Sequence, residues 1–247
     1  MGFVMVRSVD YVNMASAGEI LNGIDFHCGR MDPEKPPDYN CWLEHCRAAE
    51  SAGFRSAELQ VVDSWRNALA LAVEGAANVS NLKFRISCPI DRAIQSHPPE
   101  IPTALDGRLI LNFSYPDDDD ALDERYRLSC EFLVSCGTSR RFEIHIEGES
   151  TAAAFLAIKH ADCLWRLARP AGPFRADALP IQHFGKQVGV IRCLAGSESA
   201  EDFFAEVRRF ATNGVTRILL RQASGCTDWG GFFDAALAIL TMNSSGS

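Results

Sequence analysis

Charged and amide side chains occupy every second position of several short apolar segments. In 143–147, for example, Glu143, His145 and Glu147 alternate with isoleucines. Alternate residues of a β-strand point to opposite faces, so this pattern predicts strands with one polar and one aliphatic face. We expect the aliphatic faces to pack on helices and the polar faces to point inward. The residues placed inward are Asp25, His27, Glu58, Gln60, Arg85, Ser87, Asn112, Glu143, His145, Glu147, Arg192, Arg217 and Arg221.

Two histidines of this set, His27 and His145, are candidates for general acid–base catalysis, because an imidazole titrates near neutral pH. Together with Glu58 and Glu147 they also have the side-chain types that bind divalent metals. The sequence has no H-E-x-x-H motif or comparable ligand spacing, so we predict no metal site. The alternative is structural: arginines and carboxylates that neutralise one another inside the fold, because an unpaired buried charge is costly.

A second candidate site follows the strand that is predicted to begin at Arg141. Gly148 ends this strand, and the Ser150 hydroxyl can accept a hydrogen bond from the first turn of the next helix. The free amides and the dipole of a helix N-terminus attract anions, so Ser150 and Thr151 predict an anion site. The alternative is that Gly148 and Ser150 form only a turn and a cap.

The elements that position these residues repeat in a strand–helix order. The predicted strands begin at Ile24, Ser56, Leu82, Arg108, Arg141, Cys163, Val188 and Arg217. Eight such units in a chain of this length predict an α/β fold, a (β/α)8 TIM barrel, with shortened helical layers after the third and sixth strands. We expect one domain over 1–247, with an N-terminal extension at 1–22 and a tail at 243–247. A doubly wound sheet is the rival, but no G-x-G-x-x-G follows the first strand.

The composition excludes several classes of partner. The net charge is −8, so we expect the surface to repel nucleic acid and anionic membranes. No apolar run reaches the length of a membrane span and no secretory signal pattern opens the chain, which predicts a cytoplasmic protein. The nine cysteines include no C-x-x-C pair, so we expect reduced thiols.

Over residues 21–242 the chain resembles the luciferase-like flavin monooxygenases, most closely the alkanesulfonate monooxygenase branch. The resemblance rests on several stretches in the family's order, namely CRAAESAGFRSAELQVVDSW, NVSNLKFRISC, GRLILNFS, DERYRLSCEF, EGESTAAAFLAIKHADCLW and FAEVRRFATNGVTRILL. It implies a barrel that uses reduced FMN, supplied by a flavin reductase, to act on a small organic substrate. It also implies phosphate contacts at Tyr126, Ser150 and Thr151 and an active-site arginine at Arg192. We group Asn112 with the cofactor contacts.

The chain also departs from the family pattern. The family's long lid insertion is nearly absent between Leu194 and Ser199, and Leu194 and Ala223 stand where the sulfonate branch has a catalytic His and Tyr. The first hypothesis is therefore an FMN-dependent oxidoreductase or monooxygenase with Arg192, His145 and His27 as catalytic candidates. The second is a non-catalytic flavin-binding or partner subunit. The third is a flavin-independent acid–base enzyme that uses the polar barrel interior.

One helix suggests association. The predicted helix Asp38–Ala52 carries Trp42 beside Cys41 and His45, and we expect this group to be exposed. Exposed apolar patches commonly mark interfaces, and barrels of the resembling family pair through early helices. We therefore expect a homodimer or a heterodimer.

Overall fold

The computed structural model describes residues 25–29, 39–61, 64–117, 124–137, 141–168, 185–194, 200–213 and 215–222. The strands are β1 (Asp25–Gly29), β2 (Ser56–Gln60), β3 (Lys83–Pro89), β4 (Leu109–Ser114), β5 (Glu143–Glu147), β6 (Cys163–Leu167), β7 (Gln187–Leu194) and β8 (Arg217–Gln222). The helices are α2 (Tyr39–Ser51), α3 (Trp65–Asn78), α4 (Ile90–Ile94), the 3-10 turn η2 (Thr103–Leu105), α5 (Glu124–Gly137), α6 (Thr151–His160) and α8 (Ala200–Thr212).

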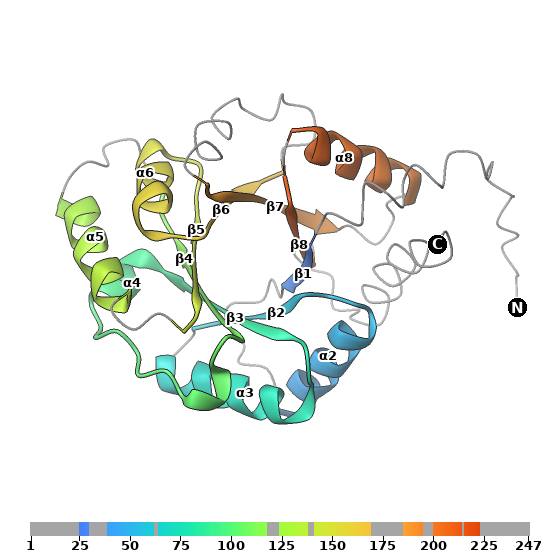
Figure 1. Cartoon of the computed structure of the whole chain (residues 1–247), viewed down its shortest axis with the longest axis horizontal. Coiled ribbons are helices and arrows are strands. Elements are labelled where there is room, and N and C mark those ends of the chain that lie inside the picture. The colour runs from blue at the N-terminus through green and yellow to red at the C-terminus, as the bar shows by residue number, and fades with distance from the viewer. Residues whose placement is uncertain are drawn as a thin grey trace, which may run out of the picture.

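Each strand pairs in parallel with the next, and β8 pairs with β1, so the sheet closes into a barrel with the helices outside (Figure 1). The closing register sets Asp25 opposite Arg217 and His27 opposite Leu219. The predicted α/β class and parallel, barrel-like sheet are confirmed. The segments that follow β6 and β8, at 169–184 and 223–247, lie outside the described residues, as do 1–22 and 195–199. The complete eightfold helical repeat, the shortened sixth layer, the terminal segments and the absent lid therefore stay predictions.

The helices form where capping residues precede small and aliphatic sequences. Ser64 caps α3 by accepting a hydrogen bond from the Asn67 amide at 3.3 Å, and Ser150 caps α6 by accepting from the Ala153 amide at 3.2 Å. The small residues let the helices lie close to the sheet: a Cβ on Gly75 of α3 would stand 2.5 Å from the Phe84 ring of β3. The outward side chains of the strands and the inward faces of these helices form the main apolar core.

The outer helical layer is short after β3, as predicted. α4 has five residues, and an irregular stretch that contains Pro98, Pro99 and Pro102 leads to η2. Proline cannot continue a helix because it lacks the amide hydrogen and its ring clashes with the preceding turn. The outer face of β4 is therefore covered in part by a loop.

The prediction that Trp42 is exposed is wrong. Its side chain is 3% exposed, its indole Nε1 donates to the Leu71 carbonyl oxygen at 2.8 Å, and its ring packs edge-on against Phe84. Trp42 therefore packs α2 against α3 and against the sheet. Dimerisation stays a prediction, without the support of a tryptophan patch. None of the described helices has the length and the apolar composition of a membrane span.

Candidate active site in the barrel interior

Most of the residues predicted to point inward do contact one another inside the barrel. They are Glu58, Arg85, Ser87, Asn112, Glu143, His145, Glu147, Arg217 and Arg221. Their parallel strands are in register, so residues at matching heights, such as Glu58 and Arg85, share a layer of the interior. For His27 only the backbone is described, and its register sets it in the layer of Ser56 and Leu219.

Two carboxylates and two arginines make the central network. Arg221 Nε and Nη2 donate to Glu58 at 3.0 and 2.8 Å, and its Nη1 and Nη2 donate to Glu147 at 2.7 and 2.8 Å. Arg85 donates through Nε to Glu58 at 3.2 Å, and its Nη2 lies 3.8 Å from Glu147. The side chains of Arg85 and Glu58 are fully buried. Each buried charge thus faces opposite charge, which offsets its lost hydration.

The ion pairs of this network lower the pKa of Glu58. Burial raises the pKa of Glu58, but the charge and hydrogen bonds of Arg221, with help from Arg85, outweigh it and bring the pKa to about 2. Ser87 also donates to Glu58, at 2.6 Å, and Asn112 Nδ2 donates to both Ser87 and Glu147 at 3.0 Å. Glu58 is therefore an ionised structural acceptor at neutral pH and holds no proton to give.

His145 is locked as a neutral imidazole. Trp165 Nε1, which can only donate, lies 2.9 Å from His145 Nδ1, so Nδ1 must accept and the proton must sit on Nε2. Nε2 in turn lies 3.0 Å from a Glu143 oxygen and donates to it. Burial lowers the pKa of His145 to about 3, the bond to Glu143 opposes this, and the charges of Arg85 and Arg217 add to the lowering. The expectation that His145 titrates near neutral pH is therefore wrong, because desolvation disfavours its cation.

A second group of charges lies toward the N-terminal ends of the strands. Glu143 contacts Lys83 and accepts from Arg217 Nη1 at 2.7 Å. Burial raises the pKa of Glu143, but its hydrogen bonds to His145 and Lys83 and the charge of Arg217 hold it well below its usual range. Lys83 was not among the residues predicted to point inward. Its place in the alternation with Arg85 and Ser87 is the signal that identifies it.

The side of the interior around β6 and β7 is apolar. Cys163, Trp165, Ile191 and Leu219 form a cluster separate from the main core. A Cβ on Gly189 would stand 2.5 Å from the Trp165 ring, so this glycine leaves the room that the indole occupies. The Arg85 guanidinium carbon lies 4.3 Å from the Trp165 ring centroid. Trp165 joins the two sides. The sequence did not assign it to the interior, because an aromatic residue in an apolar run indicates core on either face.

Arg192 does not point into the barrel, contrary to prediction. The inward residue of this part of β7 is Ile191, whereas Arg192 forms an ion pair through Nε with Glu206 of α8. The prediction followed the polar–apolar alternation, and here a helix supplies a carboxylate that lets a charged residue occupy the outer face. A role for Arg192 beside a reacting oxygen is not supported by this geometry.

The predicted anion site lies where β5 meets α6. Ser150 is buried and caps the helix, while Thr151 is exposed at its first position. Two carboxylates lie nearby: Asp117 accepts from the Glu149 amide at 2.8 Å, and Glu149 accepts from the Leu167 amide at 2.8 Å. Arg166 offsets the Glu149 charge with an ion pair at 3.4 Å. The helix N-terminus is thus formed as predicted, in surroundings that are not strongly cationic.

Tyr126 lies against the opposite end of the same helix. Lys159 Nζ, close to the C-terminus of α6, is 5.6 Å from the Tyr126 ring centroid. Burial raises the pKa of the Tyr126 phenol. The predicted phosphate contacts therefore divide into Ser150 and Thr151 at one end of α6 and Tyr126 near the other. Among the described residues, no three His, Cys, Asp or Glu side chains lie together as a metal site would require.

No protein-family model matches the chain, and no curated protein matches its sequence. The structure is similar to that of riboflavin lyase solved with modified FMN and its substrate riboflavin, with 9% identity, a TM-score of 0.63 and coverage of 91% of this chain and 92% of that chain. EDTA monooxygenase from Chelativorans sp. BNC1 is 10% identical, with a TM-score of 0.56 and coverage of 90% and 94%. Phosphoribosyl anthranilate isomerase from Thermus thermophilus is 17% identical, with a TM-score of 0.50 and coverage of 90% and 99%. At such identities these similarities show an α/β barrel fold alone, and this fold hosts different reactions in different proteins.

Proposed function

We propose that the chain is an FMN-dependent oxidoreductase of the luciferase-like kind, which acts on a small organic substrate with reduced flavin from a partner reductase. The observation that carries the proposal is the capped N-terminus of α6, at the C-terminal end of β5, where Ser150 and Thr151 offer hydroxyl groups. Parallel barrels bind their ligands at this end of the strands. The similarity to a barrel solved with a modified FMN supports the choice of ligand.

The phosphate fits the N-terminus of α6 on chemical grounds. The Ser150 hydroxyl accepts from the Ala153 amide, so its own hydrogen is directed elsewhere and can be donated to a phosphate oxygen. Thr151 adds an exposed hydroxyl. Reduced FMN, when bound, supplies the electrons for the reaction. Tyr126 would contact the phosphate only if its ring moved away from Lys159.

The cation near the isoalloxazine ring would be Arg221 in place of Arg192. The Arg221 side chain is 9% exposed, lies toward the C-terminal end of the interior, and is oriented by two carboxylates. A fixed positive charge close to a flavin ring tunes its electronics. Asn112 would act through Glu147, which accepts its amide hydrogen, and so would be a positioning residue.

A specific observation favours a second candidate, a barrel that binds flavin or a partner without its own chemistry. The central charges are engaged in ion pairs, and His145 is neutral with both ring nitrogens in hydrogen bonds. The same observation weighs against a flavin-independent acid–base enzyme that uses His145. His27 remains the acid–base candidate for either catalytic alternative. A dimer and a reductase partner belong to the proposal as well.

The proposal is tested by titrating the protein with FMN and following flavin fluorescence. Ser150→Ala should weaken FMN by about ten-fold or more, since a hydrogen bond to a charged group contributes about 1.5 to 3 kcal/mol. Riboflavin, which lacks the phosphate, should bind wild type and variant equally. Ser64→Ala is the matched control, because it removes the same kind of cap from α3, away from the proposed phosphate site.

The outcomes separate the candidates. Loss of FMN affinity in Ser150→Ala alone, together with conversion of a small organic substrate that requires both reduced FMN and oxygen, supports the oxidoreductase. FMN binding without turnover on a broad panel of small organic substrates supports the non-catalytic barrel. No binding of FMN or riboflavin at tens of micromolar would overturn both, and equal FMN affinity in Ser150→Ala and wild type would remove the phosphate site.

A further inference from the structure

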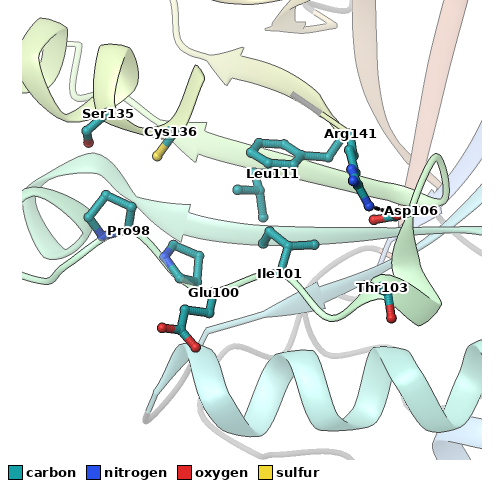
Figure 2. A pocket seen from close by; sticks show the side chains of 11 residues that line it. Pro98, Glu100, Ile101, Thr103, Asp106, Leu111, Ser135, Cys136 and Arg141 are labelled. Atoms are coloured by element: carbon teal, nitrogen blue, oxygen red, sulfur yellow. Dashed lines mark hydrogen bonds and ion pairs between the residues drawn. The ribbon is translucent and has the colours of Figure 1, made fainter. Parts of the chain in front are cut away.

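A cavity of about 400 Å³ lies on the outer face of the barrel, separate from the charged interior. It is bounded by the loop between α4 and η2, by β4, by the end of α5 and by the two residues that precede β5 (Figure 2). The cavity exists because α4 ends after five residues and the proline-containing loop covers only part of this face. Its floor residue Leu111 precedes Asn112, whose side chain points to the opposite side of the sheet.

The middle of the cavity is apolar. Leu111 and Ile101 lie close together in its centre, and Pro98 and Cys136 lie toward one end (Figure 2). Phe142 also lines the cavity. Burial raises the pKa of the Cys136 thiol to about 12, so this group is uncharged at neutral pH. A cavity of this volume matches the usual size of small-molecule sites, which run from about 300 to 1,000 Å³.

The opposite end of the cavity carries a charged pair. Arg141 Nη1 donates to Asp106 at 2.6 Å, and the two lie together at this end (Figure 2). Their side chains are 64% and 36% exposed, and an exposed ion pair contributes only about 0 to 1 kcal/mol. A guanidinium has five N–H donors, so Arg141 can keep Asp106 and still donate to a second acceptor.

We propose that this cavity binds a small, uncharged, aromatic molecule that has one hydrogen-bond acceptor directed at Arg141. The ring would lie between the proline loop and Phe142, and a carbonyl or hydroxyl oxygen would accept from the guanidinium. The carboxylates of Asp106 and Glu100 line the same cavity, and the whole chain has a net charge of −8. An anion would therefore be repelled, and an ammonium group, which only donates, could not accept the hydrogen bond that Arg141 offers.

Three probes of similar size test the charge preference: acetophenone, benzoate and benzylamine. Binding is measured by titration with backbone amide shifts as the readout. Acetophenone should bind with a dissociation constant on the order of millimolar, as suits a ligand of so few atoms. The affected amides should include those of Ile101 and Phe142. Benzoate and benzylamine should bind at least about three-fold more weakly, which is under 1 kcal/mol.

Two neighbouring positions of α5 give a matched pair of variants. Ser135 lines the cavity, whereas Val134 is exposed and does not. Ser135→Trp places an indole at the cavity end and should weaken acetophenone at least about ten-fold by occlusion, while Val134→Trp should leave it within about two-fold. Arg141→Ala should weaken it about three- to ten-fold through the lost hydrogen bond, with unchanged folding by circular dichroism.

Any of three results would overturn the proposal: no saturable shifts around the cavity, equal affinity in Ser135→Trp and Val134→Trp, or tighter binding of either charged probe. FMN affinity serves as the independent measurement. It should be the same in Ser135→Trp as in wild type, since this cavity and the N-terminus of α6 share no residue.

Discussion

The two sides of the barrel interior are filled by different kinds of side chain, one side by charged residues and the other by apolar ones. The side formed by β2 to β5 and β8 holds Glu58, Arg85, Glu147 and Arg221 in an ion-pair network, whereas the side around β6 and β7 holds an apolar cluster. Barrel interiors are ordinarily filled by branched aliphatic side chains, so the apolar side is the common solution and the charged side the unusual one.

Trp165 shows how the two sides can share one interior. Its ring packs in the apolar cluster and lies beneath the Arg85 guanidinium, and its N–H bonds to His145. The apolar side excludes water, which strengthens each ion pair and makes each unpaired charge more costly. The charged side is thus tolerated only while each charge keeps an opposite charge beside it.

The largest effect should come from removing one member of the charged side. Glu58→Leu leaves Arg85 and Arg221 dependent on Glu147, and breaking a buried pair in this way costs about 3 to 5 kcal/mol of unfolding free energy. Urea unfolding measures it. Glu131→Leu is the control, because Glu131 pairs with Arg127 on the surface of α5 and should cost no more than about 1 kcal/mol. Similar losses in both variants would show that burial does not set the cost.

Acid should destabilise the protein through His145 before it affects the carboxylates. The pKa of His145 is about 3 in the fold and 6.5 ordinarily, so the unfolded state binds more protons between these values. Stability therefore falls as the pH drops below about 6.5, by at most about 1.4 kcal/mol per pH unit. Glu58, whose pKa is lowered from 4.5 to about 2, adds a further fall only below about pH 4.5.

The His145→Gln variant isolates this contribution, because glutamine does not titrate but can both accept from Trp165 and donate to Glu143. Urea midpoints measured from pH 7 to pH 5 should fall in wild type and stay nearly level in the variant. Parallel slopes in the two proteins would contradict a neutral, buried His145.

The apolar side is tested by adding one methyl group. Gly189→Ala would place a Cβ 2.5 to 2.8 Å from three atoms of the Trp165 ring, and such overpacking costs about 1 to 3 kcal/mol. Gly137→Ala is the control, since a Cβ there meets nothing within 4 Å. The double variant Gly189→Ala/Trp165→Leu should lose less unfolding free energy than the sum of the losses in the two single variants. Strictly additive losses of unfolding free energy would show that the absence of a side chain at Gly189 is not what accommodates the Trp165 indole.

The smallest effect should come from the arginine that faces outward. Arg192→Ala removes the pair with Glu206 on α8 and should cost about 1 kcal/mol or less, because both side chains are partly exposed. FMN affinity should be unchanged. If FMN affinity instead falls strongly in Arg192→Ala but not in Arg221→Lys, then Arg192 reaches the interior and the assignment of Arg221 as the cation near the ring is wrong.

Local patterns predicted the strands to within a few residues, because both the period-two alternation and the turn and cap residues act over short distances. Ser150 was identified as a cap from its type and position alone, and the helical layer after β3 was correctly predicted to be short. Trp42 was placed wrongly because its partner, the Leu71 carbonyl, belongs to another helix and is not visible in the local periodicity.

The sequence alone determined which residues form strands and that a polar set shares the interior, since the faces of a strand follow from covalent geometry. Only the tertiary structure decided the chemistry of that set. Whether His145 titrates depends on Trp165 and Glu143 contacting its two nitrogens in a water-free interior, and whether Arg192 faces inward depends on a carboxylate from α8. Protonation and charge pairing are set by neighbours in space, and closure of the barrel brings those neighbours together from distant parts of the chain.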